Sequence, residues 1–514
     1  MTELASAPGE RASDSNGAAI TPINHWIDGS PVSGTSGRTA KVFNPATGRQ
    51  SGAVDLASVE EVDRAVQSAK TAFASWRGVS LAKRAELMFN IRELVHDRKE
   101  DIARILVAEH GKVLSDAMGE VTRGLEVIEF ACGIPTLLKG EFSEQASTGV
   151  DVYSIRQPVG VVAGITPFNF PAMVPMWMWA PAIACGNTFV LKPSEKDPSA
   201  SIFTAELLKE AGLPDGVFNV VHGDKVAVDA LLEHPDVSAL SFVGSTPIAR
   251  YIYETGTRHG KRVQALGGAK NHMIVLPDAD IDMAADAAVS AAYGSAGERC
   301  MAVSVVVAVG DAADPLVAAI QKRLPKITVG DGMNPTSEMG PLVTEAHRDK
   351  VAGYLDSGAA QGAKIVADGR ESAPEGDGFF LGVSLLDDIT TEMDAYRDEI
   401  FGPVLGVMRV GTYDEALKLI NDNPYGNGTA IFTRDGGVAR QFQFDVEAGM
   451  VGINVPIPVP VAYYSFGGWN QSLFGDSHIY GPEGIHFYTR GKVVTSRWPD
   501  PATSSVDLGF PQTR

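Results

Sequence analysis

Apolar positions recur with helical spacing in the first part of the chain. In residues 55–76 they are Val62, Ala65, Val66, Ala69 and Phe73. Ser58 and Glu61 precede this pattern and stand three residues apart, as in a capping box at the start of a helix. The pattern predicts a helix that begins near residue 55, and a second helical stretch is predicted over residues 81–109.

Beyond residue 150 the pattern changes to the short β-rich runs VGVVAGI, NTFVLKP, VFNVVHG and ALSFVGS, separated by helical segments such as SASIFTAELLKEAG. This alternation is typical of a mostly parallel sheet covered by helices. A second α/β stretch runs from HMIVLPDAD through VSVVVAVG to MVGINVP, so we place a domain boundary near residue 270. The alternating run GIHFYTRGKVV predicts an edge strand.

Length, composition and charge narrow the class of protein. The chain has 514 residues, 44% of them hydrophobic, which suffices for a large core divided among two or three domains. No apolar run reaches the roughly 18 residues that a membrane-spanning helix needs, so none is expected. The formal net charge of −20 repels phosphate backbones and argues against nucleic acid as a partner.

The termini and the cysteines indicate a cytoplasmic protein with reduced thiols. Residues 1–20 lack the basic start and apolar centre of a signal peptide and are interpreted as a flexible leader, and residues 501–514 as a tail. Cys132, Cys185 and Cys300 lie 53 and 115 residues apart, without the close pair that holds a metal. We therefore expect no metal site.

Two short motifs are candidates for a dinucleotide site, although the usual glycine fingerprint is replaced by GVVAGITPFNFP. Lys192 and Glu195 in VLKPSE follow a strand, and a carboxylate there can accept hydrogen bonds from a ribose. Gly244 and Ser245 in FVGSTPIAR precede Pro247, which suits the start of a helix whose N-terminus attracts phosphate. Taken alone, each motif is more often a turn with a surface charge than a cofactor site.

Cys300, in GSAGERCMAV, is either a nucleophile or ordinary core packing. Buried cysteine is the common case, and Cys132 and Cys185 fit it. Cys300 differs because small residues precede it, and because the charged neighbours Glu298 and Arg299 argue against burial on every side. These features allow a reactive thiolate without establishing one.

Seven ordered motifs together resemble the NAD-dependent aldehyde dehydrogenase superfamily: ITPFNFP, NTFVLKPSE, GLPDGVFNVVHG, FVGSTPIAR, GSAGERCMA, EIFGPV and FGDSHIYGPEGIHFYTR. The resemblance covers about residues 25–498 and implies an α/β, aldehyde dehydrogenase-like fold. It implies a Rossmann-type NAD-binding domain (residues 21–140 and 159–270) and an α/β catalytic domain (271–478). A small β oligomerisation arm (141–158 and 479–500) completes the fold, and by resemblance it builds a homo-oligomer, expected to be a homotetramer.

The resemblance also assigns roles to residues. Cys300 becomes the nucleophile, and Asn169 forms the oxyanion hole together with the backbone N–H of Cys300. The residues assigned to NAD are Thr166, Pro167, Phe168, Lys192, Glu195, Gly244, Ser245, Glu399 and Phe401. Glu195 near the ribose would repel a 2′-phosphate and so favours NAD over NADP.

One expected residue is missing. Hydrolytic members of the superfamily carry a water-activating glutamate in ELGGK, 34 residues before the cysteine, where this chain has Leu266, or Ala265 if the motif is shifted by one. Neither side chain can accept a proton. A thioester on Cys300 would then be transferred to a better nucleophile than water, and the thiol of coenzyme A is one. LGGAKNH with GSAGERCMA resembles methylmalonate-semialdehyde dehydrogenases, the CoA-acylating branch.

This branch implies a small semialdehyde that carries a carboxylate as the substrate. By resemblance Arg123 and Arg299 bind the carboxylate; on the sequence alone Arg123 reads as a helix-surface charge. Once a thioester has formed, the carboxylate lies β to its carbonyl, and loss of CO2 would leave an enolate that the oxyanion hole can stabilise. Methylmalonate semialdehyde would give propionyl-CoA, and malonate semialdehyde acetyl-CoA.

Three alternatives remain open at this stage: a hydrolytic aldehyde dehydrogenase that activates water through another group, a non-catalytic NAD-binding protein, and a different semialdehyde as substrate. His272 is interpreted as a structural histidine. The aromatic run in residues 461–475, with Tyr463, Tyr464 and Trp469, is either core or the lining of a substrate entrance.

Overall fold

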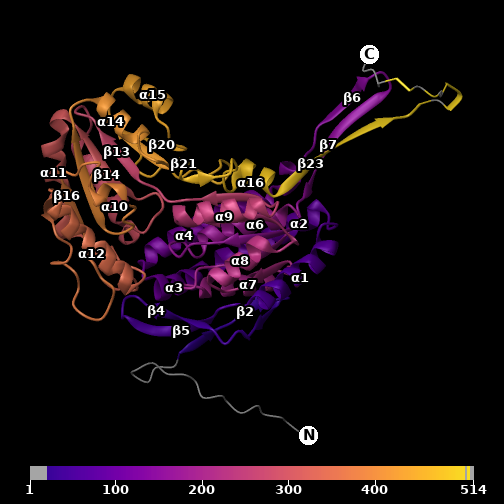
Figure 1. The fold of residues 1–514 in the computed structure, drawn as a ribbon, viewed down its shortest axis with the longest axis horizontal. Helices are drawn as coiled ribbons and strands as arrows, with labels where there is room; N and C mark the ends of the chain where they lie inside the picture. Colours follow the sequence, from indigo (N-terminus) through magenta and orange to yellow (C-terminus); the bar gives the residue numbers. More distant parts are fainter. Residues whose placement is uncertain (1–19, 500, 504–505, 507, 510–514) are drawn as a thin grey trace, which may run out of the picture.

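The computed structural model describes residues 20–499, 501–503, 506 and 508–509. The predicted leader, apart from Ile20, and most of the predicted tail lie outside the described residues. Two α/β lobes and a projecting β arm make up the molecule (Figure 1). Among the described residues, no helix combines the length and apolar character that crossing a membrane requires.

The first lobe is built on an eight-stranded sheet with the order β22-β12-β11-β8-β9-β10-β2-β3. Its five central strands are parallel, and the strands at both edges are antiparallel. The strands are β2 (His25–Ile27), β3 (Ser30–Val32), β8 (Val161–Ile165), β9 (Thr188–Lys192), β10 (Phe218–Val220), β11 (Val237–Val243), β12 (Arg262–Leu266) and β22 (Leu473–Phe474). The predicted β-rich runs thus form the parallel core of this sheet.

Helices cover both faces of the first sheet because its central strands are apolar on both sides. One face carries α1 (Val59–Trp76), α8 (Lys225–Glu233) and α9 (Thr246–Arg258). The other carries α2 (Leu81–Asp97), α3 (Lys99–His110), α4 (Leu114–Cys132), α6 (Met173–Ala184) and α7 (Ser199–Glu210), with the short α5 (Ile134–Leu137) beside α2.

The second lobe is built on a seven-stranded sheet with the order β15-β16-β17-β14-β13-β19-β20, parallel except at β15. Its strands are β13 (Asn271–Val275), β14 (Val303–Val309), β15 (Lys364–Ala367), β16 (Ser384–Asp387), β17 (Val404–Val410), β19 (Gly428–Phe432) and β20 (Met450–Ile453). The helices of this lobe are α10 (Ile281–Tyr293), α11 (Ala313–Gln321), α12 (Glu345–Ala360), α13 (Asp394–Arg397), α14 (Tyr413–Asn421) and α15 (Gly436–Asp445).

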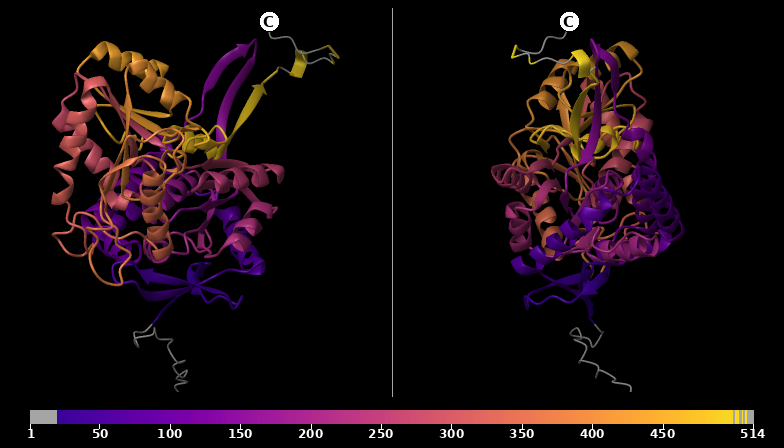
Figure 2. Two further views of the ribbon diagram at one scale, coloured as in Figure 1. Left: turned by 60° about the vertical axis from the view of Figure 1, so that its left-hand side comes forward. Right: turned by 90° about the vertical axis from the view of Figure 1, so that its right-hand side faces the viewer.

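Three smaller sheets complete the fold. β1 (Thr21–Ile23), β4 (Thr39–Asn44) and β5 (Arg49–Asp55) lie beneath the first lobe, and β18 (Tyr425–Gly426) pairs with β21 (Trp469–Asn470). β6 (Phe142–Ser147), β7 (Val150–Pro158) and β23 (Thr489–Arg497) form an arm that projects away from both lobes in every view (Figure 2). β23 lies at the edge of this arm sheet.

Several predicted elements are confirmed and some are corrected. α1 begins after Ser58, whose side chain forms the predicted capping box with Glu61. The stretch 81–109 forms two helices instead of one, because the backbone leaves helical geometry at Arg98. GIHF belongs to α16 (Gly481–Phe487), and only the following residues form β23. β22, from the stretch predicted for the catalytic domain, adds to the first sheet, and the domain boundaries stay a prediction.

Candidate active site

The loop that carries Cys300 turns sharply between α10 and β14. Ser295, Ala296 and Gly297 have the positive φ angles 54°, 52° and 73°, a left-handed conformation that side chains rarely adopt. A Cβ on Gly297 would lie 2.2 Å from the carbonyl oxygen of Gly402, so this position admits glycine only. The turn brings Cys300 back between the two lobes, where it is partly exposed.

Two asparagines fix this loop. The Asn271 side chain donates hydrogen bonds to the carbonyl oxygens of Cys300 and Ala302, both at 2.9 Å, and the Asn427 side chain donates to the Cys300 oxygen at 3.2 Å. The backbone N–H of Gly428 donates to the Asn271 amide oxygen at 3.2 Å, which orients that side chain. Neither asparagine was predicted from the sequence. The available signal was their position at the starts of two buried parallel strands, β13 and β19.

Cys300 opens into a cleft of about 830 Å³ between the lobes. The walls of this cleft contain every residue predicted to be catalytic or to bind NAD: Thr166, Pro167, Phe168, Asn169, Lys192, Glu195, Gly244, Ser245, Cys300, Glu399 and Phe401. The first-lobe residues lie at or after the carboxyl ends of β8, β9 and β11, where parallel sheets bind ligands. In the second lobe, Cys300 precedes β14, and Glu399 and Phe401 precede β17. Five of the seven motifs therefore meet in one cavity large enough for a dinucleotide.

Asn169 is 3% exposed and lies in the wall of the cleft, and its side chain has no hydrogen-bond partner among the described residues. Its backbone oxygen accepts a hydrogen bond from the Lys112 ammonium at 2.7 Å. Lys112 is paired with Glu120 at 2.5 Å, and both side chains are fully buried. Glu120 also accepts hydrogen bonds from the N–H groups of Ala172 and Met173 at the start of α6. This buried pair fixes the backbone at Asn169 and just after it, and the Asn169 side-chain amide stays free to donate.

The surroundings of Cys300 favour its thiol form over the thiolate. Burial raises the pKa of the Cys300 thiol to about 12, the nearby charge of Glu399 adds to this shift, and the N–H groups of Cys300 and Met301 oppose it. Burial likewise raises the pKa of Glu399. One Glu399 carboxylate oxygen accepts a hydrogen bond from the backbone N–H of Ala269 at 2.9 Å. Glu399 is thus held near Cys300, and both residues line the cleft.

The structure distinguishes the two positions considered for the missing glutamate. Ala265 and Val263 belong to the core on the α1–α8–α9 face of the first sheet. Leu266 points to the opposite face, is 3% exposed, and belongs to the apolar cluster against which Cys300 packs. Leu266 is therefore the residue whose side chain lies on the face of the first sheet against which Cys300 packs, and leucine cannot accept a proton.

The prediction that charged neighbours keep this segment open is wrong for Glu298. Its side chain is fully buried and lies 3.8 Å from the His110 ring and 3.7 Å from the His347 ring. Burial raises the pKa of Glu298 to about 8 and lowers that of His110. A neutral carboxyl group resolves the conflict between burial and charge.

Neither Arg299 nor Arg123 lines the cofactor cleft. Arg299 lines a separate cavity of about 680 Å³ and donates to Asp116 at 2.6 Å. Arg123 donates to Glu126 at 2.6 Å and to the carbonyl oxygen of Pro460 at 2.9 Å. Arg299, and not Arg123, thus lines this cavity, which Cys300 does not line; Arg299 and Cys300 share the wall of a separate, small cavity of about 20 Å³.

The inner end of the cleft is shaped for a dinucleotide. Lys192 lies 3.5 Å from Glu195, and burial lowers the pKa of Lys192. Ser245 precedes α9, whose first N–H groups border the cleft. A Cβ on Gly244 would lie 2.5 Å from the Phe242 ring, so a side chain there has no room. These features fit a ribose and a pyrophosphate at the N-terminus of α9.

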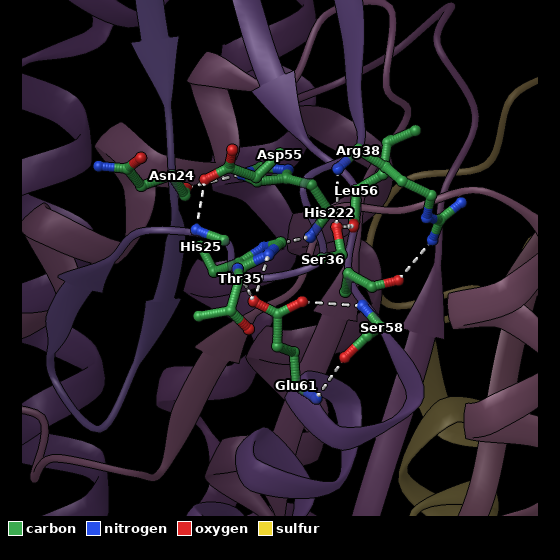
Figure 3. A network of polar contacts seen from close by, with 12 residues as sticks. Asn24, His25, Thr35, Ser36, Arg38, Asp55, Leu56, Ser58, Glu61 and His222 are labelled. Atoms are coloured by element: carbon green, nitrogen blue, oxygen red, sulfur yellow. Dashed lines mark hydrogen bonds and ion pairs between the residues drawn. The ribbon is translucent and has the colours of Figure 1, made fainter.

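A polar network around His25, His222 and Glu61 links β2, α1 and the segment after β10 in the first lobe (Figure 3). The backbone N–H of His222, just after β10, donates to the His25 ring at 3.1 Å. The other His25 ring nitrogen lies 3.9 Å from Glu61, which accepts hydrogen bonds from the N–H groups of Ser58 and Thr35. Burial lowers the pKa of both histidines, to about 3 for His222, so the network is built on neutral rings.

The remaining candidates are structural. His272 is buried, lies 3.2 Å from the Tyr396 hydroxyl, and has its pKa lowered to about 3 by burial. Cys132 and Cys185 are buried, and burial raises their pKa values to about 11 and about 12. Within the described part of the chain, no group of three or more His, Cys, Asp or Glu side chains is arranged to hold a metal ion.

Comparison with known proteins places this site in a family. The model of the aldehyde dehydrogenase family matches residues 32–494. A malonate-semialdehyde dehydrogenase of Pseudomonas aeruginosa is 56% identical over 95% of this chain and 99% of its own. Malonate-semialdehyde dehydrogenase 2 of Geobacillus kaustophilus is 49% identical over 93% and 99%.

Solved structures give the same result. The crystal structure of methylmalonate-semialdehyde dehydrogenase from Oceanimonas doudoroffii superposes with a TM-score of 0.93 at 55% identity, covering 94% of this chain and 99% of its own. A Sinorhizobium meliloti structure complexed with NAD superposes with a TM-score of 0.93 at 54% identity and the same coverage. The predicted fold class is confirmed, and this chain belongs to the aldehyde dehydrogenase family.

Proposed function

We propose that this protein oxidises malonate semialdehyde and methylmalonate semialdehyde with NAD+ and CoA, through a thioester on Cys300, to acetyl-CoA and propionyl-CoA with loss of CO2. The observation that carries the proposal is the apolar side chain of Leu266 on the Cys300 side of the first sheet. The names of the relatives at 49% to 56% identity support the substrate class.

The chain's residues divide the oxidation between nucleophile and oxyanion hole. Attack of the Cys300 thiolate on the aldehyde carbon forms a C–S bond and an alkoxide. The unpartnered amide of Asn169 and the Cys300 N–H can donate to this oxygen; one such donor contributes about 10²- to 10³-fold to kcat. When bound, NAD+ supplies the hydride acceptor and a positive charge near sulfur that favours the thiolate. Collapse of the alkoxide with loss of hydride leaves the thioester on Cys300.

The next step depends on which nucleophile reaches the thioester. Leu266 offers no base for water, so hydrolysis lacks the assistance that a general base contributes, about 10²- to 10⁴-fold. The CoA thiol is anionic to a far greater extent than water near neutral pH and displaces Cys300 without such help. The acyl group passes from one sulfur to the other, and Cys300 leaves as a thiolate ready for the next cycle.

The substrate carboxylate requires a cation in a protein of net charge −20. Arg299 precedes the nucleophile and lines a cavity of about 680 Å³, so it is the cation we assign to the carboxylate; Arg123 is assigned a supporting role from α4. After thioester formation the C–C bond to the carboxylate can break, and the electron pair forms an enolate that is protonated. The donors of the oxyanion hole stabilise this enolate in the same way.

One observation favours a second candidate, a hydrolytic aldehyde dehydrogenase. The Glu399 carboxyl group shares a wall with Cys300 and has a raised pKa, as a general base requires. Its hydrogen bond to Ala269 and its assignment to the nicotinamide ribose count against this role. The need for CoA separates the two functions.

The test is NADH formation from malonate semialdehyde with and without CoA, combined with product identification. With CoA we expect acetyl-CoA as the product. Without CoA we expect a single turnover, followed by slow release of the acyl group from Cys300. Cys300→Ala should abolish activity, whereas the buried, remote Cys132→Ala is the matched control that retains it. Free acid formed equally fast without CoA would contradict the proposal and support the Glu399 alternative.

Two finer assignments belong to the same proposal. Glu195 in the cleft favours NAD over NADP through charge repulsion of a 2′-phosphate, so Glu195→Gln should improve the NADP to NAD ratio of kcat/KM. The arm exposes Phe142 (64%) and Val493 (69%), apolar groups that a neighbouring subunit would cover in a homotetramer. Light scattering of the intact chain tests the tetramer.

A further inference from the structure

Asp116 and Gly294 contact the Arg299 side chain and have no role in the proposed mechanism. One NH2 hydrogen of its guanidinium is donated to Asp116 at 2.6 Å. This is the side-chain hydrogen bond of Arg299 within the described residues, so the remaining donors of the five-donor guanidinium stay free. The two side chains are 23% and 17% exposed, so the pair lies largely out of water.

The guanidinium lies directly against Gly294. A Cβ at Gly294 would come within 2.5 Å of NH1, 2.7 Å of Cζ and 2.9 Å of NH2 of Arg299. The φ angle of Gly294 is −55°, which every residue can adopt, so its backbone does not require glycine. A side chain at position 294 would instead displace the Arg299 guanidinium from its present position.

The surroundings of the Arg299 guanidinium have the features of a ligand site. Arg299, Asp116, Gly294 and Ser295 line the cavity of about 680 Å³. The second carboxylate oxygen of Asp116 and the hydroxyl of Ser295, a residue only 4% exposed, are buried without a hydrogen-bond partner. The cavity also holds Arg323, but that guanidinium is already bound to Asp282 and Asp286. Of the two arginines in this cavity, Arg299 is thus the one with unused donors. It precedes Cys300 in the chain, and the two residues share the wall of a second, small cavity.

We propose that Asp116 and Gly294 determine specificity for carboxylated aldehydes by positioning Arg299. Asp116 holds one edge of the guanidinium, Gly294 gives it room, and the free edge binds the substrate carboxylate beside the reacting carbon. Both are positioning residues, because they act through Arg299. This inference rests on the proposed function, in which Arg299 binds the carboxylate.

The test compares a charged with an uncharged substrate: kcat and KM are measured for malonate semialdehyde and for propanal. Asp116→Ala should raise the KM for malonate semialdehyde by about tenfold to hundredfold, the range expected for loss of a charge-assisted contact, and change propanal kinetics far less. Asp116→Asn keeps an acceptor oxygen and should restore most of the loss. Gly294→Ala should resemble Asp116→Ala, since it displaces the guanidinium.

Asp282→Asn is the matched control. It removes a carboxylate from the same cavity without touching Arg299 and should leave both substrates unaffected. Equal losses on both substrates in Asp116→Ala, or an unchanged KM for malonate semialdehyde, would overturn the inference while the proposed function stands. A wild-type protein without CoA-dependent activity on malonate semialdehyde would overturn both.

Discussion

Leu266→Glu is the substitution that most directly tests why this chain would need CoA. It places a carboxyl group on the face of the first sheet where Cys300 packs, at a position that is 3% exposed. If hydrolysis is slow only because no base is present, the variant should gain it. The burst of NADH without CoA should then be followed by a faster steady state that releases free acid.

The size of the effect can be worked out from other buried carboxyl groups of this chain. Burial raises the pKa of Glu109 to about 7 and that of Glu298 to about 8. A glutamate at position 266 in similar surroundings should titrate in the same range and act as a base near neutral pH. General-base assistance of about 10²- to 10⁴-fold is then expected in CoA-free turnover. The lost leucine burial should cost about 1.5–3 kcal/mol of unfolding free energy.

The assay follows NADH and free acid without CoA from pH 6 to pH 9. The rate in Leu266→Glu should rise with pH through roughly 7 to 8, as the carboxyl group ionises. Leu266→Gln has nearly the same shape and no basic oxygen, so it is the control for a packing effect. If both variants turn over at the wild-type rate while remaining folded, the absence of a base at this position does not explain the need for a thiol acceptor.

Three further predictions concern the support of the site. Asn169→Ala should lower kcat by about 10²- to 10³-fold for charged and uncharged aldehydes alike, with cofactor binding retained as measured by NADH fluorescence. Lys112→Met should lower the unfolding free energy by about 3–5 kcal/mol in denaturant titrations, because it leaves Glu120 charged and buried; a loss under 1 kcal/mol would contradict that account. Because the pKa of Glu298 is raised to about 8, the folded state keeps a proton on this carboxyl group that the unfolded state releases near pH 4.5. The contribution of Glu298 to the free energy of unfolding therefore falls as the pH rises from about 4.5 toward 8. Relative to Glu298→Gln, the wild type should lose up to about 1.4 kcal/mol per pH unit across this window, and parallel stability profiles would refute the assignment.

Local signals accounted for much of the fold. The capping box at Ser58 and Glu61 and the spacing behind it marked the start of α1, because those interactions lie within one turn. The break between α2 and α3 at Arg98 was not predicted, since an apolar pattern continues through both helices. Asn271 and Asn427 were also missed, because their partners at Cys300 lie 29 and 127 residues away in the chain.

By itself, the sequence determined the chemistry that is available: a cysteine after a run of small residues, an asparagine in PFNFP, and a leucine or alanine where a base is expected. Residue types and short spacings are local, so the sequence is enough to identify them. Only the tertiary structure decided which groups meet. It turned Leu266 and not Ala265 toward the cysteine side, buried Glu298, and seated Arg299 between Asp116 and Gly294. Strand register and the packing of two lobes set these outcomes, and both depend on contacts between residues far apart in the chain.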